Sequence, residues 1–166
     1  SLTWNNTGAA SYEIHRSDSY YGFNLIGYAT TNSYLDTSAQ PNQTYIYRVR
    51  PYNGALSEPE IATTYFFGND PIVPNVTNIK ALHLTQLRTV TNYARTTARL
   101  PQSTSIATAP AAGVAILPAH IMELRAAINE ARSYLGLLPV TFTNPTITTG
   151  MQIKAVHIQE LRNALK

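Results

Sequence analysis

Three stretches with nearly the same residues decide how the second half of this chain folds. Residues 79–88 read IKALHLTQLR, residues 116–125 read ILPAHIMELR and residues 153–162 read IKAVHIQELR. Each position recurs after 37 residues, and a fixed period of this size is typical of a repeated supersecondary unit. The shared positions are an isoleucine, a histidine, a leucine and an arginine: Ile79, His83, Leu87, Arg88, Ile116, His120, Leu124, Arg125, Ile153, His157, Leu161 and Arg162.

Apolar residues follow each histidine at helical spacing. In the second copy they stand three and four residues apart from Ile121 to Leu135, which predicts a helix of about 18 residues with one apolar face. Pro118 suits the start of this helix, because the missing N–H of a proline is not needed in the first turn. A single helix of this kind cannot bury its own apolar face. We therefore expect residues 79–166 to form an all-α array of three helices, starting near residues 79, 116 and 153.

The repeated histidines permit a metal or a structural interpretation. Three imidazoles, one from each unit, are suitable zinc ligands. The acidic position beside them is not constant, however, because Gln86 stands in the first copy where the others have Glu123 and Glu160. We therefore expect a structural role for each histidine, either within its own unit or at the joint to the next one. The glutamates and arginines are expected to form ion pairs, and no metal or other cofactor is predicted.

The first 67 residues follow a different period. Short runs rich in Tyr, Val, Ile and Thr, such as YEIHR at 12–16 and TYIYRVRPY at 44–52, alternate with turn-forming clusters such as NNTGAA and QPNQ. Several short strands at this spacing predict an all-β sandwich. A stiff connector with Asp70, Pro71 and Pro74 follows, so the expected domains are 1–67, a linker at 68–78, and 79–166.

Residues 1–67 resemble a fibronectin type III domain of the immunoglobulin-like class. The resemblance rests on SLTWNN at 1–6, YLDT at 34–37 and PNQTYIYRV at 41–49. It implies that Tyr45 is the tyrosine of the family's tyrosine corner. It also implies an inward-facing core of Trp4, Tyr12, Ile14, Tyr45, Tyr47 and Val49.

One feature departs from the family pattern. Family members have about ten further residues before the first strand seen here, which form an edge strand called A. Without that strand, the sandwich is expected to expose backbone hydrogen-bonding groups and an apolar strip. Either residues outside this numbering or a strand from another copy covers this gap, or the gap stays open because the chain is truncated. We also expect an uncovered face at the end of the third helix. Head-to-tail contacts between such surfaces do not close and would build fibres.

The second half also has a resemblance. The pattern IxAxHxxELRxA is similar to short helical repeats that follow fibronectin type III domains in large bacterial secreted or surface proteins. A related HxxELR string occurs before trimerising helices in phage tail proteins. These resemblances carry no activity to transfer, but they favour an extracellular or cell-surface location in a bacterium.

Composition and missing motifs narrow the function classes. The chain has no cysteine, and its 12 Lys and Arg residues are spread out without a basic run, which disfavours nucleic-acid binding. No apolar stretch approaches the roughly 20 residues of a membrane span. The motifs of zinc proteases, serine hydrolases, phosphate loops and calcium loops are absent from the sequence. We therefore expect a protein that is not an enzyme.

The expected function is that of an extracellular structural protein that assembles with copies of itself into a cell-surface filament or layer. The alternative is an adhesion or anchoring module that binds glycan or cell-wall polymer. Exposed aromatic residues in SYYGF at 19–23 are either a stacking surface for sugars or part of a satellite core. Three sequons predict possible N-glycosylation of a glycoprotein, at Asn5, Asn42 and Asn75.

Overall fold

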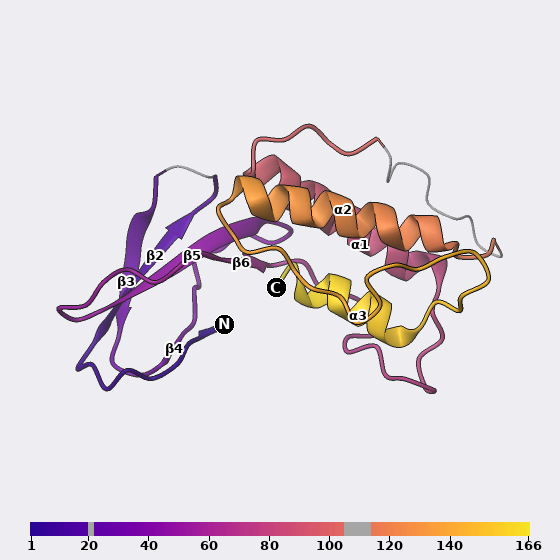
Figure 1. Cartoon of the computed structure of the whole chain (residues 1–166). Coiled ribbons are helices and arrows are strands. Elements are labelled where there is room, and N and C mark those ends of the chain that lie inside the picture. Colours follow the sequence, from indigo (N-terminus) through magenta and orange to yellow (C-terminus); the bar gives the residue numbers. More distant parts are fainter. Residues whose placement is uncertain (20–21, 105–113) are drawn as a thin grey trace.

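A computed structural model describes residues 1–19, 22–104 and 114–166. Six strands precede three helices along the chain, as the change of sequence period predicts (Figure 1). The strands are β1 Leu2–Thr3, β2 Tyr12–Ser17, β3 Asn24–Ala29, β4 Ser33–Tyr34, β5 Thr44–Pro51 and β6 Glu60–Thr63. The helices are α1 Ala81–Thr97, α2 Pro118–Tyr134 and α3 Ala155–Asn163.

The strands form two antiparallel sheets. One has two strands in the order β1-β4, and the other has four in the order β3-β2-β5-β6. Alternation along β2 and β5 turns Ile14, Tyr45 and Tyr47 to one face, where they pack with Leu2 and Trp4 from the smaller sheet. Two sheets therefore enclose a small core of their own.

A carboxylate just after β4 ties the two sheets together at one side. Asp36 Oδ2 accepts hydrogen bonds from Arg16 Nη1 of β2 at 2.7 Å and from the Tyr47 hydroxyl of β5 at 2.9 Å. Burial and the hydrogen bond to this carboxylate raise the pKa of Tyr47 above its ordinary value. The Tyr45 hydroxyl accepts a hydrogen bond from Gln40 N at 3.0 Å, which fixes the chain entering β5.

The helices start at equivalent residues of the three copies, two positions after each repeated isoleucine. Pro118 occupies the first turn of α2, as the sequence predicts. The apolar stripes of all three helices are buried against one another, and Ile158, Leu161 and Leu165 of the last unit are fully buried. The expectation of an uncovered face on the third helix is therefore wrong, because α3 packs against both α1 and α2.

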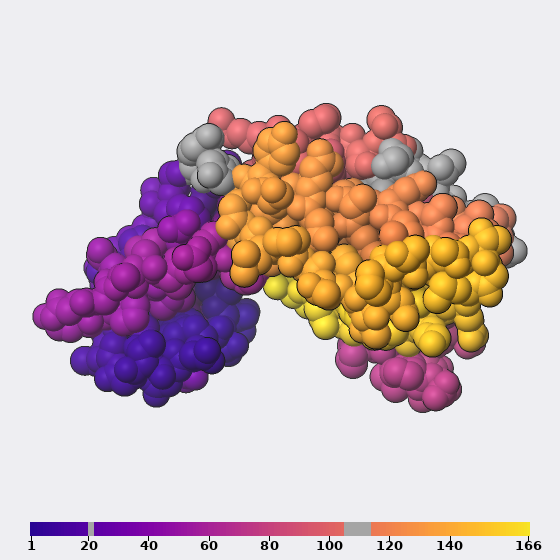
Figure 2. All heavy atoms as spheres, in the orientation of Figure 1, coloured from indigo at the N-terminus to yellow at the C-terminus, as the bar shows by residue number. Residues whose placement is uncertain are grey.

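The larger core joins the two parts of the chain. The outer face of β5 and β6 supplies Ile46 and Ile61, which pack in the same cluster as the helical residues. Thr97 Oγ1 of α1 donates a hydrogen bond to Thr44 O of β5 at 3.1 Å. Figure 2 shows the sheet part and the helical part as two lobes that meet along this contact. The two parts of the chain therefore share one core, to which Phe67 and Ile72 also belong.

Candidate functional site

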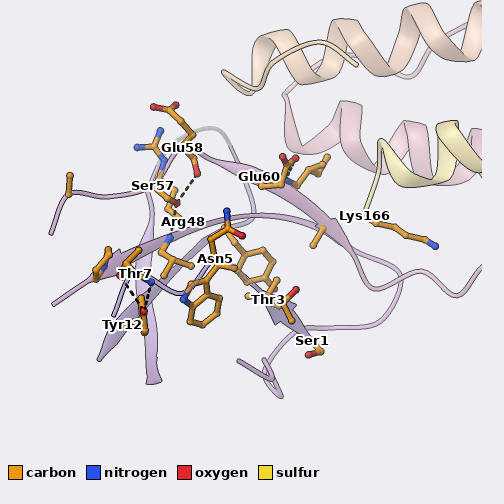
Figure 3. Close-up of a pocket in the computed structure, with 18 residues that line it drawn as sticks. Ser1, Thr3, Asn5, Thr7, Tyr12, Arg48, Ser57, Glu58, Glu60 and Lys166 are labelled. Atoms are coloured by element: carbon orange, nitrogen blue, oxygen red, sulfur yellow. Dashed lines mark hydrogen bonds between the residues drawn. The ribbon is translucent and has the colours of Figure 1, made fainter. Parts of the chain in front are cut away.

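The first candidate site is a cleft at the open side of the two sheets. It has a volume of about 640 Å³ and lies beside β1, which pairs with β4 on one edge only. β6 likewise pairs only with β5. Side chains from both sheets reach the cleft (Figure 3). The residues that line it include Trp4, Tyr12, Tyr47, Val49, Ile61 and Ala62.

The predicted core of the sheet part divides at this cleft. Tyr12, Ile14, Tyr45 and Tyr47 are buried, whereas Trp4 and Val49 are only half-buried. Both half-buried residues line the cleft. The indole Nε1 of Trp4 is buried and has no hydrogen-bond partner among the described residues. The sheet core is thus open to solvent at the cleft beside β1.

The turn at the base of the cleft is held by Tyr12. Its hydroxyl donates to Asn6 Oδ1 at 2.9 Å and accepts a hydrogen bond from Thr7 N at 3.1 Å. The hydrogen bonds from Thr7 lower the pKa of the Tyr12 phenol. Because the turn after β1 is fixed in this way, the open edge of β1 has a defined position beside the cleft.

The second candidate site is the set of joints between the helical repeats. In each unit the histidine lies at the third residue of its helix, and its Nδ1 accepts a hydrogen bond from the backbone N–H that precedes the helix. The donors are Lys80 N at 3.2 Å, Leu117 N at 3.1 Å and Lys154 N at 3.1 Å. Glutamate or glutamine commonly takes this capping role. The histidine signature is therefore a helix-start device in all three copies.

The opposite ring nitrogen faces an asparagine of the preceding segment. His83 Nε2 lies 3.4 Å from Asn69 Oδ1, and His157 Nε2 lies 2.9 Å from Asn144 Oδ1. Since Nδ1 is an acceptor, the proton of each neutral ring is on Nε2. In the sequence, Asp70-Pro71 and Asn144-Pro145 stand equally far before the repeated isoleucine, with Ala107-Thr108 at that place in the middle copy. The asparagines that face the histidines, Asn69 and Asn144, differ from this register by one residue. Residues 107 and 108 lie outside the described residues.

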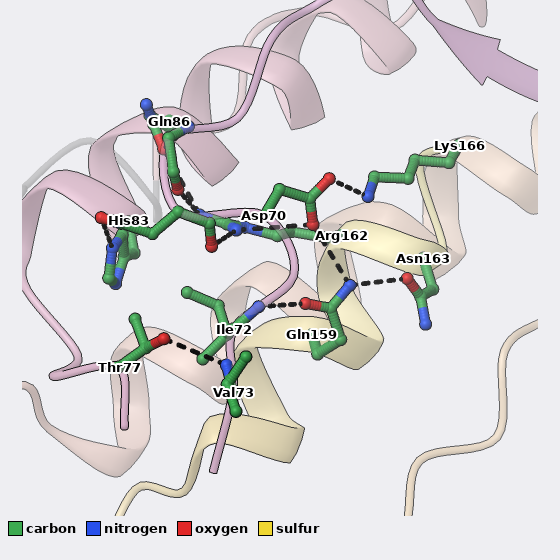
Figure 4. Close-up of polar contacts among 12 residues, drawn as sticks. Asp70, Ile72, Val73, Thr77, His83, Gln86, Gln159, Arg162, Asn163 and Lys166 are labelled. Carbon is green, nitrogen blue, oxygen red and sulfur yellow. Dashed lines mark hydrogen bonds and ion pairs between the residues drawn. The ribbon is translucent and has the colours of Figure 1, made fainter. Parts of the chain in front are cut away.

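In the second and third units, the repeated arginine reaches from its helix to the segment in front of another unit. Arg125 Nη1 of α2 donates to Asn144 O, before α3. Arg162 Nη1 of α3 donates to Asn69 O at 2.8 Å, before α1, and its Nη2 donates to Gly68 O at 2.8 Å (Figure 4). The three units therefore close into a ring, with the last unit bound to the first.

The variable acid position serves the same joints. Gln86 Oε1 accepts a hydrogen bond from Gly68 N at 3.2 Å, and Glu160 Oε1 accepts one from Thr143 N at 2.9 Å. The amide oxygen of glutamine and a carboxylate oxygen of glutamate can each accept this backbone hydrogen bond, which explains why the residue varies. The histidine and the acid or amide thus hold their own unit, and Arg125 and Arg162 hold the joint.

Electrostatics at two of these joints favour the neutral form of His83 and His157. Burial lowers the pKa of His83 and His157, and the guanidinium groups of Arg162 and Arg125 act in the same direction. Arg88 differs from its two equivalents, since its buried Nε and Nη1 have no hydrogen-bond partner among the described residues. The described residues contain no group of three potential metal ligands among His, Cys, Asp and Glu.

Sequence reasoning missed a second layer of repeated polar residues. Arg95 and Arg132 are 37 residues apart and each donates from Nε to a carbonyl six residues later, Pro101 O and Leu138 O, at 2.9 Å. Three residues before each of them, Asn92 and Asn129 bond to the backbone of the following loop. The strings NYAR and NEAR carry this signal in the sequence at the same period.

The remaining predicted residues lie on the surface or beside the core. Asn5, Asn42 and Asn75 are exposed. Ile79, Ile116 and Ile153 are partly buried and pack against the large core at the helix starts. Phe23 is half-buried with the Arg48 guanidinium 5.0 Å from its ring centre, so it is not an open stacking surface. Tyr20 and Tyr21 of the same predicted surface lie outside the described residues.

Comparisons with protein-family models, curated protein sequences and solved structures find no match for this chain. Among the described residues, no helix is long and apolar enough to cross a membrane.

Proposed function

We propose that this chain is a non-enzymatic structural protein of the cell exterior that associates with copies of itself through the open edge of β1. The cleft beside β1 carries the proposal, since it leaves Trp4 and Val49 half-buried between two unpaired strand edges. An added strand covers apolar side chains and satisfies backbone groups in one step. We further propose that the sheet part is a fibronectin type III sandwich in which β1 has an unpaired edge among the described strands.

Two observations support the fibronectin type III assignment. The strand orders β1-β4 and β3-β2-β5-β6 are those expected for the strands that follow strand A in such a sandwich. The hydrogen bond from Gln40 N to the Tyr45 hydroxyl has the geometry of a tyrosine corner. The assignment predicts that the strand filling the cleft pairs with β1.

The proposal of a filament rests on unlike strand edges, since β1, β4, β3 and β6 each have one edge without a partner among the described residues. β1 and β3 each have one unpaired edge, and they belong to different sheets. A contact between β1 of one copy and β3 of the next joins unlike surfaces, so it repeats without closing. A contact between two β1 edges would instead give a closed dimer. Both arrangements are self-association, and imaging distinguishes them.

Sedimentation velocity with the purified chain at increasing concentration tests the proposal, together with electron microscopy of the same samples. Self-association is expected to appear below about 0.1 mM, within the range of specific protein interfaces. Val49→Lys places a charge in the cleft and should abolish association. Val73→Lys is the matched control, because Val73 is exposed in the segment between sheet and helices.

A chain that stays monomeric at that concentration overturns the proposal of self-assembly. Equal association of the Val49→Lys and Val73→Lys variants would show that the cleft is not the contact. A far-ultraviolet circular dichroism spectrum and a thermal melt of each variant show that the charge has not unfolded the sheet.

A further inference from the structure

A second concave surface lies on the outer face of the four-stranded sheet, separate from the β1 cleft. The helices cover only one end of this face. On β5, Ile46 is buried under the helices, whereas Arg50, four residues later, is exposed. Glu13 of β2 is paired directly with Tyr28 of β3 and with Arg50 of β5, so the three side chains form one row across the strands. A groove of about 430 Å³ begins at this row.

Two tyrosine rings border the groove. Tyr28 is 65 % exposed and Tyr52 is 67 % exposed, although large aromatic side chains are normally covered in small domains. Neither hydroxyl bonds to another described residue. Both rings therefore offer an aromatic face and a free hydroxyl to solvent.

The polar groups between the rings have capacity left for a ligand. Glu13 Oε2 accepts hydrogen bonds from Arg50 Nε at 2.8 Å and from His15 Nε2 at 3.0 Å. These hydrogen bonds lower the pKa of Glu13, which keeps the carboxylate ionised. Glu13 Oε1 and the Asn53 side-chain amide have no partner among the described residues. Asn53 has a φ of 58°, in the turn directly after Tyr52.

The ligand class follows from these groups. An aromatic face stacks on the C–H face of a pyranose ring, and carboxylate, guanidinium and amide groups pair with neighbouring hydroxyls. The charges of Glu13 and Arg50 offset each other, so a strongly charged ligand gains nothing here. A nucleic-acid strand needs a cationic groove, which this surface does not provide. We propose that the Tyr28–Tyr52 groove is a binding site for a neutral oligosaccharide.

This inference goes beyond self-association and does not depend on it. It places glycan binding on the sheet part of the chain, and it does not involve the helical repeats. The β1 cleft and the Tyr28–Tyr52 groove have Pro51 as their one common lining residue, so each can be tested in the presence of the other.

The test is a titration of the nitrogen-15-labelled chain, carrying Val49→Lys to keep it monomeric, with cellotetraose, chitotetraose and mannotetraose. Tetragalacturonate serves as the acidic probe. At least one neutral probe is expected to shift the amide resonances of residues 11–13, 28, 50 and 52–54. Calorimetry with that probe gives the affinity.

Variants connect binding to the groove. Tyr28→Ala and Tyr52→Ala should each weaken binding about tenfold, since each removes one stacking ring. Tyr28→Phe keeps the ring and should lose less than Tyr28→Ala. Tyr134→Ala is the matched control, because Tyr134 is 58 % exposed on α2 and should leave the affinity unchanged.

Three results would overturn the proposal. The first is that no neutral probe shifts a resonance at about 10 mM, a concentration well above a dissociation constant of 1 mM. The second is that the shifts are confined to residues outside the groove. The third is that the tyrosine-to-alanine variants bind with the same affinity as the Tyr134→Ala control. Tighter binding of tetragalacturonate than of every neutral probe would also refute the neutral ligand class. None of these results bears on whether the chain self-associates.

Discussion

Arg162→Met should break the joint that closes the helical ring. Arg162 is fully buried and donates to Gly68 O and Asn69 O, each at 2.8 Å. Its guanidinium also lies 5.0 Å from the centre of the Phe67 ring and 3.6 Å from Asp70 Oδ1. Methionine keeps the length and apolar stem of the side chain but removes every one of these donors.

The cost follows from the groups that lose their partner. Gly68 is half-buried and Asn69 is exposed, so each lost hydrogen bond to their carbonyls costs about 1 kcal/mol, at the low end of the usual 1–3 kcal/mol. The lost contact with the aromatic ring adds about 1 kcal/mol. Removing a buried charge returns part of this, because the guanidinium no longer has to be desolvated. We expect the free energy of unfolding to fall by about 2 kcal/mol, a substantial part of the 5–15 kcal/mol that is usual for a domain.

Urea unfolding followed by circular dichroism measures this change. Arg88→Met is the matched control, because it occupies the same repeat position but two of its buried nitrogens have no described partner. That variant should cost less than about 1 kcal/mol or should stabilise the chain. If Arg162→Met costs no more than Arg88→Met, the carbonyl contacts do not hold the ring closed and the reasoning is wrong.

Three further outcomes are expected. The free energy of unfolding should fall as the pH drops below about 6.5, because His83 and His157 have a lowered pKa in the folded chain and take up protons more readily in the unfolded one. Urea midpoints at pH 7 and pH 5.5 measure this fall. Replacing both histidines with glutamine, which also caps helices, should remove most of the difference. His157→Ala should cost about 1–3 kcal/mol in a urea melt and more than His120→Ala, because His157, unlike His120, is fully buried with a described asparagine partner. Tyr45→Phe should cost about 1 kcal/mol in the same assay, since the hydroxyl accepts one hydrogen bond from Gln40 N, and no loss would show that this bond does not support the sheet.

The sequence predicts the elements well because each has a local signal. The 37-residue period and Pro118 place the helix starts, and the alternation of YEIHR and TYIYRV places two central strands. It does not predict what the helices contact. The sequence around Ile46 and Ile61 does not show that these two residues pack against helices on the outer face of the sheet. Contacts of this kind depend on the path of the chain in three dimensions.

The candidate sites were predictable to different degrees. The repeated histidine indicates a structural role, yet the acceptor geometry at Nδ1 depends on backbone groups that the sequence does not show. The closure of the ring by Arg162 needs two segments that are 93 residues apart in the sequence. The Tyr28–Glu13–Arg50 row requires the strand register, since alternation alone does not say which strands are neighbours.

The short third helix explains why the sheet is joined to the repeats. α1 and α2 have 17 residues each, whereas α3 has nine, so α3 does not cover the far ends of the other two. The outer face of β5 and β6 takes that place, with Ile46 and Ile61 in the helical core and Arg132 of α2 bonded to Glu60 of β6 at 3.1 Å. The helical ring is thus closed at one end by Arg162 and at the other by the sheet.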